Sequence, residues 1–171
     1  MSNLLIQNAT MVLPNTTVVG DLLIENGLIS TILPGGGLQV EGVKTIDATG
    51  LHLLPGIIDP QVHFRDPGQP EKEDLYSGSC AAASGGVTSF LDMPNNVPSQ
   101  TTLQSMHEKI ATGNRRCVTN FGFFIGATES NVEELVKAVG TPESPIAIPG
   151  ICGIKIFMGS STGDLLSLIH I

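Results

Sequence analysis

The chain has 171 residues, of which 41% are hydrophobic and 14% charged, so it can build a folded core. Its formal net charge of −8 argues against nucleic acid or an anionic membrane as a partner. No apolar run approaches the ~20 residues of a membrane-spanning helix. The N-terminus also lacks a basic segment followed by a long apolar run, so we expect a cytoplasmic protein.

Residues 1–52 predict short strands separated by turns. Apolar runs occupy residues 4–6, 11–13, 18–24 and 28–33. Asn26-Gly27 lies between two of these runs and predicts a tight hairpin. The glycine run at 35–37 precedes no helix and no Lys-Ser/Thr pair, so we expect a flexible turn rather than a phosphate-binding loop.

From residue 53 onward, predicted strands alternate with predicted helices. Strands are expected to end near Arg65 and to span residues 87–93, 118–125 and 151–158. Helices are expected over residues 74–84, 101–113 and 130–140, where Thr101-x-x-Gln104 and Ser130-x-x-Glu133 suggest capping boxes. This alternation indicates parallel βα units and an α/β fold.

The most informative segment is residues 59–68, Asp-Pro-Gln-Val-His-Phe-Arg-Asp-Pro-Gly, which follows an apolar run. If the strand continues through it, its period of two places Gln61, His63 and Arg65 on one face. Polar side chains on a buried strand are unfavourable unless they have partners. A metal ligand beside a guanidinium that binds a carboxylate would provide such partners.

Three blocks carry a family resemblance: residues 54–68, 85–95 (Gly-Gly-Val-Thr-Ser-Phe-Leu-Asp-Met-Pro-Asn) and 153–163 (Gly-Ile-Lys-Ile-Phe-Met-Gly-Ser-Ser-Thr-Gly). They resemble the first-, second- and fourth-strand signatures of the dihydroorotases, in the cyclic-amidohydrolase branch of the amidohydrolase superfamily. The resemblance covers residues 4–164.

The resemblance implies a (β/α)₈ TIM-type barrel, of which this chain supplies the first four strands. A full barrel needs about 250 residues, so we expect the chain to be incomplete. Residues 1–52 would form the N-terminal part of a composite β-sandwich, and residues 53–165 the first half of the barrel. Residues 166–171 match a translated sequencing adapter and suggest a non-native tail; the alternative is the start of a fifth strand.

The same resemblance implies a site with one or two Zn²⁺ ions. His63 and a carboxylated Lys155 would bind the metal, and Gln61 stands where the superfamily usually has a histidine. An amide oxygen is a weaker zinc ligand than imidazole, so a single zinc and a weakened pair both remain open. Arg65 and Asn95 would hold the substrate carboxylate, and the general base is expected beyond Ile171.

We therefore expect a zinc-dependent cyclic amidohydrolase that interconverts dihydroorotate and N-carbamoyl-aspartate in de novo pyrimidine biosynthesis. One alternative is a non-catalytic dihydroorotase-like partner of aspartate transcarbamoylase; another is an allantoinase or hydantoinase, which the Arg65 and Asn95 pairing disfavours. The protein could form a homo-oligomer. The truncated chain alone is expected to be inactive.

Overall fold

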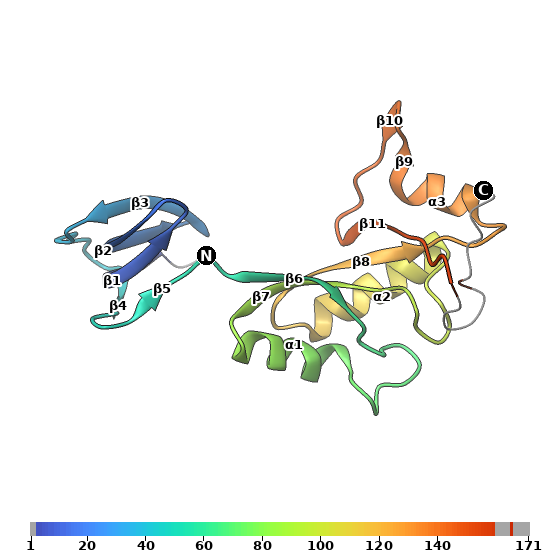
Figure 1. The fold of residues 1–171 in the computed structure, drawn as a ribbon, viewed down its shortest axis with the longest axis horizontal. Coiled ribbons are helices and arrows are strands. Elements are labelled where there is room, and N and C mark those ends of the chain that lie inside the picture. Colours follow the sequence, from blue (N-terminus) through green and yellow to red (C-terminus); the bar gives the residue numbers. More distant parts are fainter. Residues whose placement is uncertain (1–2, 160–164, 166–171) are drawn as a thin grey trace. The chain divides into compact units, whose positions relative to one another are not determined.

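The structure is a computed structural model that describes residues 3–159 and 165. It forms two compact units, Met1–Pro55 and Gly56–Ile171 (Figure 1). The predicted tail at residues 166–171 lies outside the described residues.

The first unit contains a single five-stranded sheet. Its strands are β1 (Leu4–Leu13), β2 (Thr16–Glu25), β3 (Leu28–Pro34), β4 (Lys44–Asp47) and β5 (His52–Leu53). The order is β3-β2-β1-β4, with β5 also paired to β1. Strands β1 to β3 are antiparallel, whereas β4 and β5 run parallel to β1. The second layer of the predicted β-sandwich is not among the described residues of this unit.

Local sequence explains where the first unit bends. Asn26 and Gly27 have φ of 54° and 81° and join β2 to β3, which confirms the predicted hairpin. The two runs at residues 4–6 and 11–13, predicted as separate strands, form the single strand β1. This strand is interrupted at Asn8, which has φ of 59° where the pairing register shifts.

The glycine run at residues 35–37, predicted to be a flexible turn, is tied to a buried carboxylate. Gly37 and Leu38 donate their amides to Asp21 Oδ2 at 2.7 and 2.9 Å, and Asn8 donates its amide to Oδ1 at 2.9 Å. These donors, that of Asn8 first, hold the pKa of Asp21 below its ordinary value against the opposing effect of burial. A Cβ at Gly36 would lie 3.1 Å from Asp21 Oδ1, so the turn wraps closely around this carboxylate.

The second unit consists of βα repeats around a parallel sheet. Its main elements are β6 (Ile57–Val62), α1 (Leu75–Ser84), β7 (Val87–Asp92), α2 (Leu103–Arg116), β8 (Asn120–Gly126), α3 (Val132–Val139) and β11 (Ile151–Lys155). The sheet order is β11-β8-β7-β6, so strands that follow one another in the chain are neighbours. This matches the predicted alternation of four strands and three helices. A short hairpin of β9 (Gly140–Thr141) and β10 (Ser144–Pro145) was not predicted.

Two of the predicted helix starts were wrong. The capping box of α2 is formed by Thr102 and Ser105 rather than by Thr101 and Gln104. Helix α3 begins after Asn131 without a side-chain cap. By contrast, α1 agrees with the helix predicted over residues 74–84, and Asp74 caps it by accepting the amide of Ser77 at 2.7 Å.

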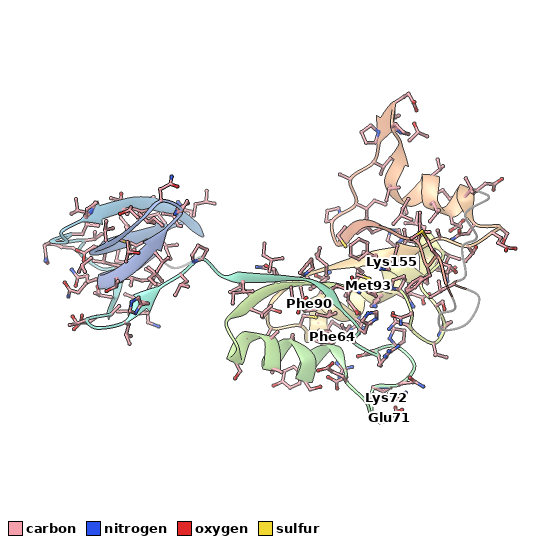
Figure 2. All side chains as sticks on the ribbon, viewed as in Figure 1. Phe64, Glu71, Lys72, Phe90, Met93 and Lys155 are labelled. Carbon is pink, nitrogen blue, oxygen red and sulfur yellow. The ribbon has the colours of Figure 1, made fainter. Side chains whose placement is uncertain are left out.

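Three buried phenylalanine side chains, Phe64, Phe90 and Phe123, contribute to the core of the second unit. Its buried members come from helices, strands and the segment after β6: Phe64, Leu75, Phe90, Met106, Phe123, Ile125 and Ala138. The Phe64 and Phe90 rings meet edge to face with centroids 4.8 Å apart (Figure 2). A Cβ at Gly78 of α1 would lie 2.6 Å from the Phe64 ring, so this glycine lets the helix approach Phe64 closely.

The outer strands of the parallel sheet expose apolar side chains. Ile57 and Ile58 on β6 are 55% and 62% exposed, and Ile156 and Met158, just after β11, are 58% and 74% exposed. Strand edges of this kind promote pairing with other chains.

We predict that the chain self-associates through these edges. Replacing Ile58 with Lys places a charge on the outer strand β6 and should shift sedimentation velocity profiles toward the monomer. Val132→Lys is the control, because Val132 is 50% exposed but lies on α3. Equal effects of both substitutions would contradict an association that depends on the strand edge.

We also predict that Asp21→Asn destabilises the first unit by about 2 kcal/mol, the scale of a hydrogen bond to a charged group. An amide offers one acceptor oxygen, so its NH₂ group would face at least one of the three backbone donors. Because the pKa of Asp21 is depressed, its contribution is present above about pH 4 and is lost as the pH falls further. Urea unfolding of the chain, followed by the NMR signals of residues 3–55, should show this loss of stability. Glu41 is exposed, so Glu41→Gln should have almost no effect.

Candidate active site

Two strand-end segments bring together three of the residues predicted to form the site. His63 and Arg65 follow β6, and Asn95 follows β7. The Nδ1 atom of His63 lies 2.8 Å from Asn95 Oδ1, and Arg65 Nη1 donates to the backbone carbonyl of Asn95 at 3.2 Å. His63 and Arg65 are half-buried and Asn95 is buried. An imidazole and a guanidinium therefore share one small polar site.

The contact with Asn95 determines which nitrogen of His63 is free. An amide oxygen can only accept a hydrogen bond, so Nδ1 of His63 carries the proton. In the neutral imidazole, Nε2 then carries the unshared lone pair. Metal-binding histidines typically donate their second ring N–H to an oxygen in this way.

The predicted strand through Arg65 was wrong, because β6 ends at Val62. At Phe64, side chains rather than a neighbouring strand take the backbone hydrogen bonds, and the amide of Arg65 donates to the carbonyl of Glu73 at 2.9 Å. Phe64 donates its amide to Asp92 Oδ1 at 3.0 Å and accepts from Asn96 Nδ2 at 3.0 Å. The alternation that placed Gln61, His63 and Arg65 on one face of a strand therefore does not extend to Arg65.

Gln61 and Lys155 are not joined to this cluster. Gln61 is exposed, and its backbone N–H donates to Asp59 Oδ1 at 3.1 Å. Lys155 ends β11, at the same end of the parallel sheet as Met93 after β7 (Figure 2), and its Nζ lies 5.2 Å from the Phe157 ring centroid. Between residues 3 and 159, no hydrogen bond joins Lys155 to His63 or Asn95.

The side chains predicted to bind metal could supply part of a metal site. His63 offers an oriented Nε2, Gln61 offers a weak amide oxygen, and Lys155 would become an anionic ligand only if carboxylated. A catalytic zinc usually has three protein ligands. In the part of the chain that the structure describes, no group of three His, Cys, Asp or Glu side chains could hold a metal ion.

A buried ion pair beneath the site was missed by the sequence analysis. Lys109 of α2 donates to Asp92 Oδ2 at 2.7 Å and to Asn96 Oδ1 at 2.6 Å. The side chains of Lys109 and Asp92 are 1% and 0% exposed. Burial lowers the pKa of Lys109 and raises that of Asp92, while each opposite charge counteracts the shift of the other. The spacing of Lys109 from Met106 and Gly113, which share the buried face of α2, could have revealed it.

Arg116 holds the loop between β6 and α1. Its Nη1 and Nη2 atoms donate to Asp66 Oδ2 at 2.6 Å and to Asp74 Oδ2 at 2.7 Å. Asp66 and Asp92 are thus paired with Arg116 and Lys109 rather than with Arg65. Among the residues that the structure describes, Arg65 has no carboxylate partner.

Cys117 does not add a reactive thiol near this network. It is half-buried, and the pKa of its thiol is raised to about 11. Burial is the larger cause, and the negative charges of Asp92 and Asp66 add to it. The thiol therefore stays protonated at neutral pH, which makes it a poor nucleophile and metal ligand.

Comparisons with known proteins identify the family of the chain. A sequence profile of the amidohydrolase family matches residues 52–142. The chain belongs to the amidohydrolase family. A dihydroorotase of Methanosarcina acetivorans is 36% identical over 166 residues, covering 96% of this chain and 33% of that protein. A mitochondrial allantoinase of Aquarana catesbeiana is 32% identical over 157 residues, covering 91% of this chain and 31% of that protein.

Solved structures show the same fold. An L-hydantoinase (dihydropyrimidinase) from Arthrobacter aurescens superimposes with a TM-score of 0.81 at 26% identity, covering 99% of this chain and 36% of that one. The chain spans about a third of the length of the curated relatives it matches. Relatives named dihydroorotase, allantoinase and hydantoinase all occur at similar identity, so the comparisons support a cyclic amidohydrolase without selecting one substrate.

None of the helices that the structure describes is long and apolar enough to cross a bilayer.

We predict that Arg116→Met loosens the loop that carries the site. Leu75 donates its amide to Asp66 and Ser77 to Asp74, so both amides report on the carboxylates that Arg116 holds. Their hydrogen exchange should accelerate about fivefold, the scale of a partly exposed ion pair. Arg115→Met is the matched control, because Arg115 contacts only Thr112 of the same helix among the described residues. Unchanged exchange in Arg116→Met would contradict this role.

Proposed function

We propose that this chain carries part of the active site of a zinc-dependent cyclic amidohydrolase that interconverts dihydroorotate and N-carbamoyl-aspartate. The observation that carries the proposal is Arg65, a half-buried guanidinium beside His63 with no described carboxylate partner. Dihydroorotate carries a carboxylate, whereas allantoin and unsubstituted hydantoin carry none. A planar guanidinium binds a carboxylate through two parallel hydrogen bonds.

In this proposal each residue has a distinct task. Arg65 would bind the substrate carboxylate, and Asn95, already in contact with both Arg65 and His63, would orient the ring. His63 and carboxylated Lys155 would hold one or two zinc ions, with Gln61 as a weaker ligand. A bound zinc would polarise the ring amide and lower the pKa of water toward ~7. We place the general base beyond Ile171, outside this chain.

Excluding water from the ring would be a task of the loop between β6 and α1. Arg116 ties this loop at Asp66 and Asp74, while the amide of Val97 donates to the carbonyl of Pro67 at 3.3 Å. The loops after β6 and β7 therefore contact each other directly. Such contacts help to hold the reacting groups in a fixed geometry.

A second candidate is hydrolysis of a neutral ring, as the names of the allantoinase and hydantoinase relatives suggest. A third is a non-catalytic subunit that binds aspartate transcarbamoylase. Exposed Gln61, which stands in place of a histidine, favours this third reading. We propose a cytoplasmic location and a homo-oligomer for the enzyme.

The test compares hydrolysis of dihydroorotate, allantoin and hydantoin by a form of the protein extended to the length of its relatives. We expect zinc to co-purify with this form and dihydroorotate to be preferred. The 171-residue chain alone should be inactive. Arg65→Met should lower kcat/KM for dihydroorotate about 10- to 100-fold, the scale of a charged hydrogen bond, while Arg115→Met should not.

Three results would contradict the proposal. A preference for allantoin or hydantoin would favour the second candidate. A folded protein that hydrolyses none of these substrates, with or without bound zinc, would favour the third. Undiminished turnover of dihydroorotate by Arg65→Met would remove the observation on which the assignment depends.

A further inference from the structure

One peptide segment lies between the two proposed functional residues of the β6 loop. Phe64 separates His63 from Arg65, and both of its backbone polar groups are held by buried side chains. Its amide donates to Asp92 Oδ1, and its carbonyl accepts from Asn96 Nδ2, each at 3.0 Å. The Phe64 ring is itself buried, so both backbone and side chain are fixed.

The two side chains that hold Phe64 meet at a single ammonium group. Lys109 Nζ donates to Asp92 Oδ2 at 2.7 Å and to Asn96 Oδ1 at 2.6 Å. It also lies 4.7 Å from the centroid of the Phe123 ring. Lys109 is 2% exposed, and it comes from α2 rather than from either strand-end loop.

Charge explains why this position requires a cation. Asp92 is fully buried, and an ionised carboxylate without a compensating charge is strongly unfavourable there. Lys109 compensates it and orients the Asn96 amide so that its oxygen faces Nζ and its NH₂ faces Phe64. The closed circuit from Lys109 through Asp92, Phe64 and Asn96 leaves each of these polar groups with a partner.

The circuit also reaches the second loop of the site. Asn96 follows Asn95, whose side-chain oxygen contacts His63 and whose carbonyl accepts from Arg65. Fixing Asn96 therefore restrains the residue that touches both functional side chains. Lys109 is thus linked to both loops through Asp92 and Asn96, and none of its described hydrogen bonds is to His63 or Arg65.

We propose that Lys109 is a positioning residue, which orients His63 and Arg65 by fixing the Phe64 peptide groups through Asp92 and Asn96. The inference rests on the function proposed for His63 and Arg65. Loss of an ordinary core contact would destabilise the second unit as a whole. Loss of Lys109 should instead disorder the segment around Phe64 more than the rest of the second unit.

The test uses the 171-residue chain without metal or substrate. The ¹⁵N imidazole spectrum at about pH 8, where an ordinary histidine is neutral, reports which ring nitrogen of His63 carries the proton. A His63→Ala spectrum assigns the signal. Amide hydrogen exchange at Phe64, relative to Phe90 and Phe123, reports local opening. Neither reading requires hydrolysis, so failure of the proposed function would not affect them.

Lys109→Met should convert His63 from a single Nδ1–H form to a mixture of tautomers. It should also accelerate exchange of the Phe64 amide about tenfold relative to Phe90 and Phe123, the scale of one hydrogen bond. Met106→Ala is the matched control, because Met106 is equally buried on the same helix but outside the circuit. It should lower overall stability while leaving the His63 tautomer and the relative exchange of Phe64 unchanged.

The proposal is overturned if Lys109→Met keeps the Nδ1–H tautomer and the relative protection of Phe64, or if Met106→Ala changes them equally. It is also overturned if the unmodified chain shows His63 protonated on Nε2. Should Lys109→Met fail to fold, Asn96→Ala keeps the Lys109–Asp92 ion pair and removes the two hydrogen bonds of the Asn96 side chain, to Lys109 Nζ and to the Phe64 carbonyl. Accelerated exchange of Phe64 in that variant supports the proposal, and unchanged exchange overturns it.

Discussion

The site depends on one buried carboxylate. Asp92 ends β7, accepts the amide of Phe64 and is compensated by Lys109 of α2. This arrangement takes the chain out of the sheet after Val62, because a side chain replaces the backbone partner that a neighbouring strand would supply. It also leaves Arg65 without Asp92 as an ion-pair partner. Together with the Arg116–Asp66 ion pair, it leaves the Arg65 guanidinium without a carboxylate partner among the described residues.

Much of the fold could be predicted because local signals and overall topology agree. Asn26-Gly27 fits only a tight hairpin, Asp74 is positioned to cap a helix, and alternating strands and helices indicate parallel βα units. Predictions failed where contacts between distant residues decide local structure. The glycine turn is held by Asp21, and Asn8 interrupts β1, but neither contact is visible in the nearby sequence.

The residues of the site could be named from motifs, but their arrangement could not. His63, Arg65 and Asn95 do converge, although through a loop rather than through the face of a strand. Period-two alternation assumes that the ladder continues, and the Asp92 side chain ends it. Lys109 carries no motif. It lies on the buried face of α2 with Met106 and Gly113, and a lysine at such a position is a signal that a search for metal ligands does not detect.

The central claim is that Arg65, freed from competing carboxylates, binds a substrate carboxylate beside His63. The most direct measurement is a crystal structure of the extended protein with zinc and N-carbamoyl-aspartate. Our account predicts a ligand carboxylate paired with the Arg65 guanidinium and in contact with Asn95, and zinc on Nε2 of His63. A carboxylate side chain paired with Arg65, or a ligand bound away from it, would contradict the account.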